Sequence, residues 1–99
     1  MSEWVYFLHA PRENFAATMT DDKREVRGRH VEWLTARFEE GSIVVVGPTL
    51  GPVNTGICVF EAEDEAAAQA VMEADPAIAS GIGRGELRPF RMLYLRGRD

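Results

Sequence analysis

Apolar residues along this chain fall into two kinds of pattern, short continuous runs and helical stripes. The continuous runs are 4–8 (WVYFL), 43–46 (IVVV), 57–61 (ICVFE) and 87–95 (LRPFRMLYL). Runs this short, rich in β-branched and aromatic residues, are typical of strands. Pro89 lies inside the last run, so we expect its beginning to form a sheet edge or a bulge.

Two stretches between these runs have the periodicity of helices. Residues 21–40 place an apolar side chain or a histidine every four positions, which predicts one buried stripe. The members of this stripe are Val26, His30, Leu34 and Phe38. Gly41 suits the left-handed residue that ends a helix. A second helix is predicted over the alanine-rich residues 63–74, and Pro76 ends it.

The remaining segments are rich in residues that break regular structure. Pro11 begins a loop after the first run, and residues 15–20 are interpreted as either a helical turn or a packed loop. Glycine and proline also punctuate residues 47–56 and 77–85, which we expect to be loops.

The resulting order, β-α-β-β-α-β, predicts an α+β fold over one domain, residues 1–99. It is the order of a ferredoxin-like sandwich, in which two helices cover one face of an antiparallel sheet. The other face stays uncovered, yet the strands carry more apolar surface than two short helices can bury. Because an exposed apolar face usually marks an interface, we expect a homodimer that pairs sheet against sheet. Whether such dimers assemble further is left open.

Composition and charge exclude some classes of function and partner. The net charge is −5, which argues against nucleic acid as a partner because phosphate contacts need a basic face. The basic residues between 23 and 29 alternate with acids, so we interpret them as a solvated helix face. There is no apolar run of about 20 residues, so no membrane span and no membrane partner are predicted. The N-terminus has no basic-then-apolar signal pattern, so secretion is not expected. The single cysteine, Cys58, is expected to be a buried inert thiol in a reducing cytoplasm.

Several side chains are candidates for a site. His30 is a titratable ring on an apolar stripe, and it is either a site residue or a core residue whose ring binds a backbone carbonyl. His9 and Arg12 follow the first strand, where a loop can face a pocket, and the guanidinium of Arg12 suits an anionic group. Phe15 and Trp33 are the aromatic residues nearest to these groups, although core packing also explains both. Neither a metal-ligand spacing nor a nucleotide-binding loop is present, so no metal and no cofactor are predicted.

Several segments together resemble a known family. They are HAPRENF (9–15), TMTDDKREV (18–26), H-x-x-W-L (30–34), EEGSIVVVGP (39–48) and ADPAIASGIGRGELRPF (74–90). In this order they resemble the YCII-related family, a group of dimeric α/β barrels with a ferredoxin-like fold. The resemblance implies a dimer with a small pocket in each protomer. It also implies a histidine–aspartate pair in that pocket, which falls on His30 and Asp75.

The resemblance extends to activity only in part. One branch of the family is similar to enzymes that remove chloride from chlorinated hydroxyhydroquinones. Some members carry an aspartate shortly after the Gly-Pro turn, whereas the corresponding segment here, TLGPVNTG, has no acid.

The first hypothesis is a small cytoplasmic enzyme in which His30 moves a proton and Asp75 orients its ring. Its substrate would be a small cyclic or aromatic compound, anionic if Arg12 binds it, and the reaction an elimination, an isomerisation or a hydrolysis. In the alternative, the same pocket binds a small metabolite without catalysis. A third interpretation is a structural dimerisation domain that associates with other proteins. A structural role for the two residues also stays open, in which Asp75 caps the turn before Pro76 and His30 is a packed core ring.

Overall fold

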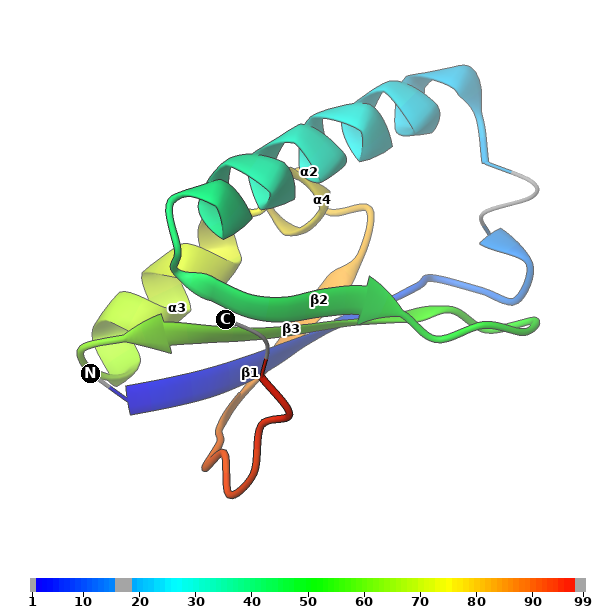
Figure 1. The fold of residues 1–99 in the computed structure, drawn as a ribbon. Coiled ribbons are helices and arrows are strands. Elements are labelled where there is room, and N and C mark those ends of the chain that lie inside the picture. Colours follow the sequence, from blue (N-terminus) through cyan, green and yellow to red (C-terminus); the bar gives the residue numbers. More distant parts are fainter. Residues whose placement is uncertain (1, 16–18, 98–99) are drawn as a thin grey trace.

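The computed structural model describes residues 2–15 and 19–97 of the chain. Its strands are β1 (Ser2–His9), β2 (Ile43–Pro48), β3 (Thr55–Ala62) and β4 (Arg84–Pro89). Its helices, labelled as in Figure 1, are α2 (Asp21–Glu39), α3 (Glu65–Ala74) and α4 (Pro76–Ala79). Residues 16–18, within the stretch expected to be a turn or a packed loop, lie outside the described residues.

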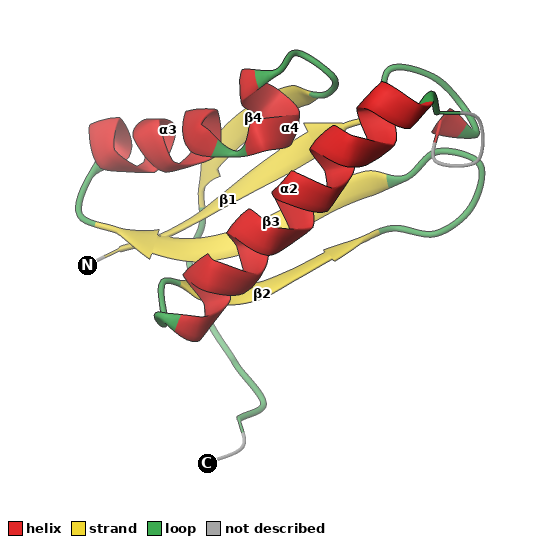
Figure 2. Cartoon of the chain, turned by 90° about the horizontal axis from the view of Figure 1, so that it is seen from above, coloured by secondary structure: helices red, strands yellow, loops and turns green. Residues whose placement is uncertain are grey.

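The four strands form one antiparallel sheet in the order β2-β3-β1-β4. β1 pairs with β3 on one side and β4 on the other, while β2 pairs with β3 at an edge of the sheet. All three helices lie on the same face of this sheet, as Figures 1 and 2 show from two directions. This is the predicted ferredoxin-like α+β fold, with α4 as a short addition after α3.

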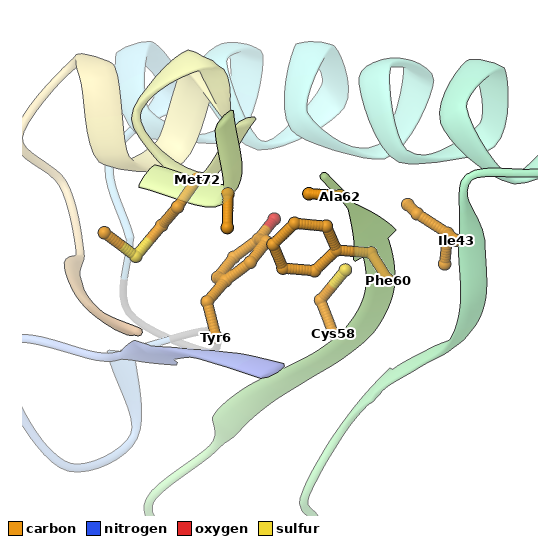
Figure 3. Packing of buried hydrophobic residues seen from close by; sticks show 7 residues of the cluster. Tyr6, Ile43, Cys58, Phe60, Ala62 and Met72 are labelled. Carbon is orange, nitrogen blue, oxygen red and sulfur yellow. The ribbon is translucent and has the colours of Figure 1, made fainter. Parts of the chain in front are cut away.

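The core lies between the sheet and the helices. Because side chains alternate between the two faces of a strand, Tyr6 of β1 and Phe60 of β3 point to the same side. Their rings meet edge to face with centroids 5.8 Å apart. Met72 of α3 packs on them from above, and Cys58 lies beside Tyr6 (Figure 3). Cys58 is therefore the buried free thiol that the sequence predicted.

The prediction of the last strand was wrong in its position. The structure begins β4 at Arg84 and ends it at Pro89, whereas the apolar run predicted residues 87–95. Proline has no N–H to donate to a strand ladder, so pairing stops there. After Pro89, the Phe90 N–H donates one further backbone bond, to the Glu3 carbonyl. Residues 90–97 form neither a helix nor a strand.

The expected loop at 77–85 is also partly regular, because it holds most of α4 and the first residues of β4. Gly85 explains how β4 can run so close to the helices. A Cβ atom at this position would lie 2.8 Å from Ile78 Cδ1 and 2.9 Å from Met72 Sδ. The glycine therefore permits a close approach that was not visible in the residue pattern.

Helix α2 begins and ends nearly where the sequence predicts. Thr20 caps its first turn by accepting a bond from the Lys23 N–H, and Gly41 has the left-handed φ of 96° expected after its end. The predicted stripe is less buried than expected, since Phe38 is 47% exposed. Figure 2 shows α2 crossing the sheet diagonally, so its last turn lies near the start of β2, an edge strand, and has little sheet beneath it.

Candidate functional site

The two residues of the expected dyad are brought together although 45 positions separate them in sequence. His30 lies in the middle of α2, and Asp75 lies between α3 and α4. His30 Nδ1 is 2.6 Å from Asp75 Oδ1, a short distance that is typical of hydrogen bonds to charged groups. The side chain of Asp75 is completely buried, and that of His30 is 16% exposed. His30 can therefore reach solvent or a ligand, whereas Asp75 cannot.

The position of Asp75 follows from the local sequence. Pro76 cannot continue α3, and it biases Asp75 toward the extended conformation seen in the structure, with φ −61° and ψ 122°. A new helix starts at once, and Asp75 caps it by accepting a bond of 2.9 Å from the Ala77 N–H to Oδ1. Capping and pairing with histidine were alternative interpretations of the sequence. In the structure, the same carboxylate does both.

A third residue of this cluster, Tyr6, was missed by the sequence analysis. Its hydroxyl donates a hydrogen bond of 2.6 Å to Asp75 Oδ2. Tyr6 belongs to the apolar run of β1, and it was interpreted only as part of a strand. The usable signal was chemical: a buried tyrosine hydroxyl usually finds an acceptor, and few acceptors exist in an apolar core.

Burial keeps the Tyr6 hydroxyl and the Cys58 thiol in their protonated, neutral forms. Burial raises the pKa of Tyr6 above its ordinary value, and the nearby Cys58 and Asp75 add to this effect. Burial likewise raises the pKa of the Cys58 thiol to about 12. Tyr6 is thus a stable donor toward Asp75, and Cys58 is a protonated thiol rather than a nucleophile.

A cavity of about 440 Å³ opens beside the dyad. Its volume lies in the usual range of ligand pockets, roughly 300–1,000 Å³. His30 and Tyr6 line this cavity, and so do two of the residues that the sequence proposed for binding, His9 and Phe15. Most of its wall is apolar, with contributions from Leu8, Val26, Leu34, Val46, Ile57 and Ile82. The cavity can therefore accept a small, largely apolar molecule in reach of His30.

His9 is held at the cavity by a carboxylate of its own. Its Nε2 lies 3.0 Å from Glu86 Oε1, and its ring stacks on Phe7. The hydrogen bond with His9 lowers the pKa of the Glu86 carboxyl, and Arg88 lowers it further. The antiparallel pairing of β1 with β4 places these residues together, which the misplaced last strand could not predict.

Arg12 and Trp33, the other two proposed binding residues, are not among the described residues that line the cavity. The guanidinium of Arg12 lies 5.0 Å from the ring centre of Phe15, so it borders a cavity residue. Trp33 packs against the Arg37 guanidinium at 5.5 Å. Two cations that were interpreted as a solvated helix face, Lys23 and Arg27, do line the cavity.

The described residues were also considered for metal binding and membrane insertion. Over residues 2–15 and 19–97, no group of three or more histidine, cysteine, aspartate or glutamate side chains is placed to hold a metal ion. In the same part of the chain, no helix has the length and apolar character to cross a membrane.

Comparison with known proteins connects this geometry to a family. None of the curated proteins matches the chain. Among solved structures, the fold is similar to that of 5-chloro-2-hydroxyhydroquinone dehydrochlorinase from Burkholderia phenoliruptrix AC1100, in complex with 2,5-dihydroxybenzoquinone. The TM-score is 0.66 at 18% identity, over 89% of this chain and 93% of that one. The YCII-related domain matches residues 4–91, nearly the whole chain, and the protein therefore belongs to the YCII-related family.

Proposed function

We propose that this protein is an enzyme in which His30 transfers a proton to or from a small cyclic or aromatic substrate bound in the cavity. One observation carries the proposal: the ring of His30 lines the cavity while its Nδ1 is 2.6 Å from the buried carboxylate of Asp75. A histidine that served only to pack would not need a desolvated carboxylate, which costs free energy to bury unless it has partners.

The chemistry follows from the two ring nitrogens. With its proton on Nδ1 directed at Asp75, neutral His30 presents the lone pair of Nε2, which has no hydrogen-bond partner among the described residues. Nε2 can then accept a proton from a substrate O–H or C–H and return it to a leaving group or to carbon. The Asp75 carboxylate stabilises the imidazolium formed in between. Asp75 is itself held by Tyr6 and by the Ala77 N–H, so little reorganisation is needed.

The family and the structural comparison support a ring compound as the substrate. The similar structure is that of a dehydrochlorinase, and its bound ligand is a dihydroxybenzoquinone. In this chain the apolar wall would contact the faces of such a ring, with Phe15 and His9 beside it. Elimination, isomerisation and hydrolysis all require proton transfer, and the dyad serves each of them.

The test is turnover of chlorinated hydroxyhydroquinones, followed by chloride release and by the absorbance of the product. We expect His30→Ala and Asp75→Asn to lower kcat by at least about 100-fold, because general acid–base catalysis contributes at least that much. Glu32→Ala is the control, since Glu32 is exposed on the same helix. Unchanged turnover in His30→Ala would refute the proposed role.

The same experiment separates catalysis from binding alone. Ring compounds that bind the wild-type protein without any turnover, and that also bind His30→Ala, would favour a non-catalytic module that holds a small metabolite. Binding can be followed by the amide chemical shifts of cavity residues, which report occupancy whether or not a reaction occurs.

We also propose that the protein forms a homodimer through the sheet face opposite the helices. This face has no covering helix in the described chain (Figure 1), and Val45 of β2 is 55% exposed. The segment after β4 adds exposed Phe90, Leu93, Tyr94 and Leu95. Apolar surface of this extent is typical of interfaces. Light scattering at micromolar concentration should give a dimer mass, and Val45→Asp should shift it toward the monomer.

A further inference from the structure

The charge around the cavity differs from that of the whole chain. The protein has 16 acidic and 11 basic residues, yet none of the described residues that line the cavity is an aspartate or a glutamate. Two permanently charged side chains do line it, Lys23 and Arg27. A recess lined by one sign of charge concentrates ligands of the opposite sign.

The two cations lie on one face of α2. Lys23 and Arg27 are four residues apart, so they are neighbours on the helix surface, and like charges at this spacing repel each other. Within the described part of the chain, neither forms an ion pair with a carboxylate. The ammonium group of Lys23 lies over the ring of Phe15, with Nζ 5.5 Å from the ring centre. An anion between them would relieve this repulsion.

Both cations precede His30 on α2, toward the N-terminal end of the helix. Arg27 precedes His30 by three residues, or about 4.5 Å along the helix axis, and Lys23 precedes it by about 10.5 Å. Both cations are exposed, whereas His30 is mostly buried. The cations therefore lie on the solvent side of the cavity, and His30 lies deeper.

We infer that the cavity selects ring compounds that carry an acidic group, a carboxylate or a phenolate, and that Lys23 and Arg27 bind this group at the cavity entrance. The inference rests on the proposed function in taking this cavity as the substrate site. It adds the charge of the substrate and the two residues that recognise it. The anionic group is bound on the solvent side, and the opposite edge of the ring then points toward His30.

The experiment compares two ring compounds that differ in charge, 2,5-dihydroxybenzoate and the neutral 2,5-dihydroxybenzamide. Affinities are measured by calorimetry for the wild type, Lys23→Gln and Arg27→Gln. We expect the acid to bind more tightly than the amide, and each substitution to weaken the acid by about two- to fivefold, as exposed ion pairs do. Binding of the amide should not change. Arg29→Gln is the matched control, because Arg29 lies on the same helix but does not line the cavity.

The outcomes test the inferred preference for an anionic ring separately from the proposed catalytic role of His30. Equal affinity for acid and amide, no binding of either, or equal effects of Arg27→Gln and Arg29→Gln would overturn it. If turnover of a neutral ring is then still lost in His30→Ala, the proposed function survives without this specificity. Conversely, a preference for the acid that persists in His30→Ala supports the inference even if no turnover is found.

Discussion

The substitution Tyr6→Phe tests the hydrogen-bond cluster that positions His30. It removes a single hydroxyl and leaves the ring that packs against Phe60. The lost bond joins two buried groups, because Tyr6 donates to Asp75 Oδ2 inside the core. The other donors to Asp75 among the described residues, His30 Nδ1 and the Ala77 N–H, both bind Oδ1. Oδ2 would thus keep no hydrogen-bond partner among the described residues.

The expected cost can be worked out from this arrangement. A hydrogen bond to a charged group contributes about 1.5–3 kcal/mol to stability. Because Tyr6→Phe leaves a buried acceptor unpaired, we expect the free energy of unfolding to fall by an amount in the upper half of this range, ~2–3 kcal/mol. For a domain of this size, each kcal/mol lowers Tm by about 4–8 °C. Since small domains have a stability of about 5–15 kcal/mol, the variant should still fold.

The assay is urea unfolding followed by circular dichroism, at one protein concentration for all variants. Tyr94→Phe is the control, because it makes the same chemical change at a side chain that is 94% exposed in the single chain, and it keeps the apolar ring available to the proposed dimer interface. In an Asp75→Asn background, the cost of Tyr6→Phe should fall to about 1 kcal/mol, since the acceptor is then neutral. If Tyr6→Phe and Tyr94→Phe unfold at the same urea concentration, the cluster does not stabilise the fold as argued.

Two further predictions concern groups with shifted pKa values. Because the pKa of Cys58 is about 12, its thiol should react with a disulfide reagent about 1,000-fold more slowly in the folded protein than an ordinary cysteine does. It should react fully after unfolding, and fast reaction of the folded protein would contradict this prediction. The lowered pKa of Glu86 means that the folded protein binds its proton less readily than the unfolded chain, whose Glu pKa is about 4.3. The contribution of Glu86 should therefore be present above this value and lost as pH falls through the lower pKa of the folded state. Wild type and Glu86→Gln should differ in unfolding free energy near pH 6, and this difference should shrink as the pH is lowered below about 4.3.

Patterns local in the chain predicted most of the fold. Apolar runs and a four-residue stripe give rise to strands and helices through short-range geometry, so β1, α2, β2 and β3 were found close to their places. The last strand was misplaced because apolar character alone extended it to Leu95. Pairing with β1 begins at Arg84 and stops at Pro89, and such register is a property of two strands far apart in sequence.

The residues of the candidate site likewise fall into those that the sequence indicated and those that only the tertiary structure revealed. His30 was singled out by its place on an apolar stripe, and Asp75 by the resemblance to a family. The buried hydroxyl of Tyr6 indicates that an acceptor is needed but not which one, because it meets Asp75 only when a strand and a helix junction 69 positions apart come together. Lys23 and Arg27 appear solvated in the sequence, and only the packing of α2 over the sheet makes them part of a cavity.

The sequence by itself thus determined the order of elements, the fold class and the histidine at the centre of the site. The tertiary structure alone decided which groups surround that histidine and which side chains face the cavity. The physical reason is distance along the chain: propensity and periodicity act over a few residues, whereas hydrogen bonds between buried groups join segments that only the folded sheet and helices bring into contact.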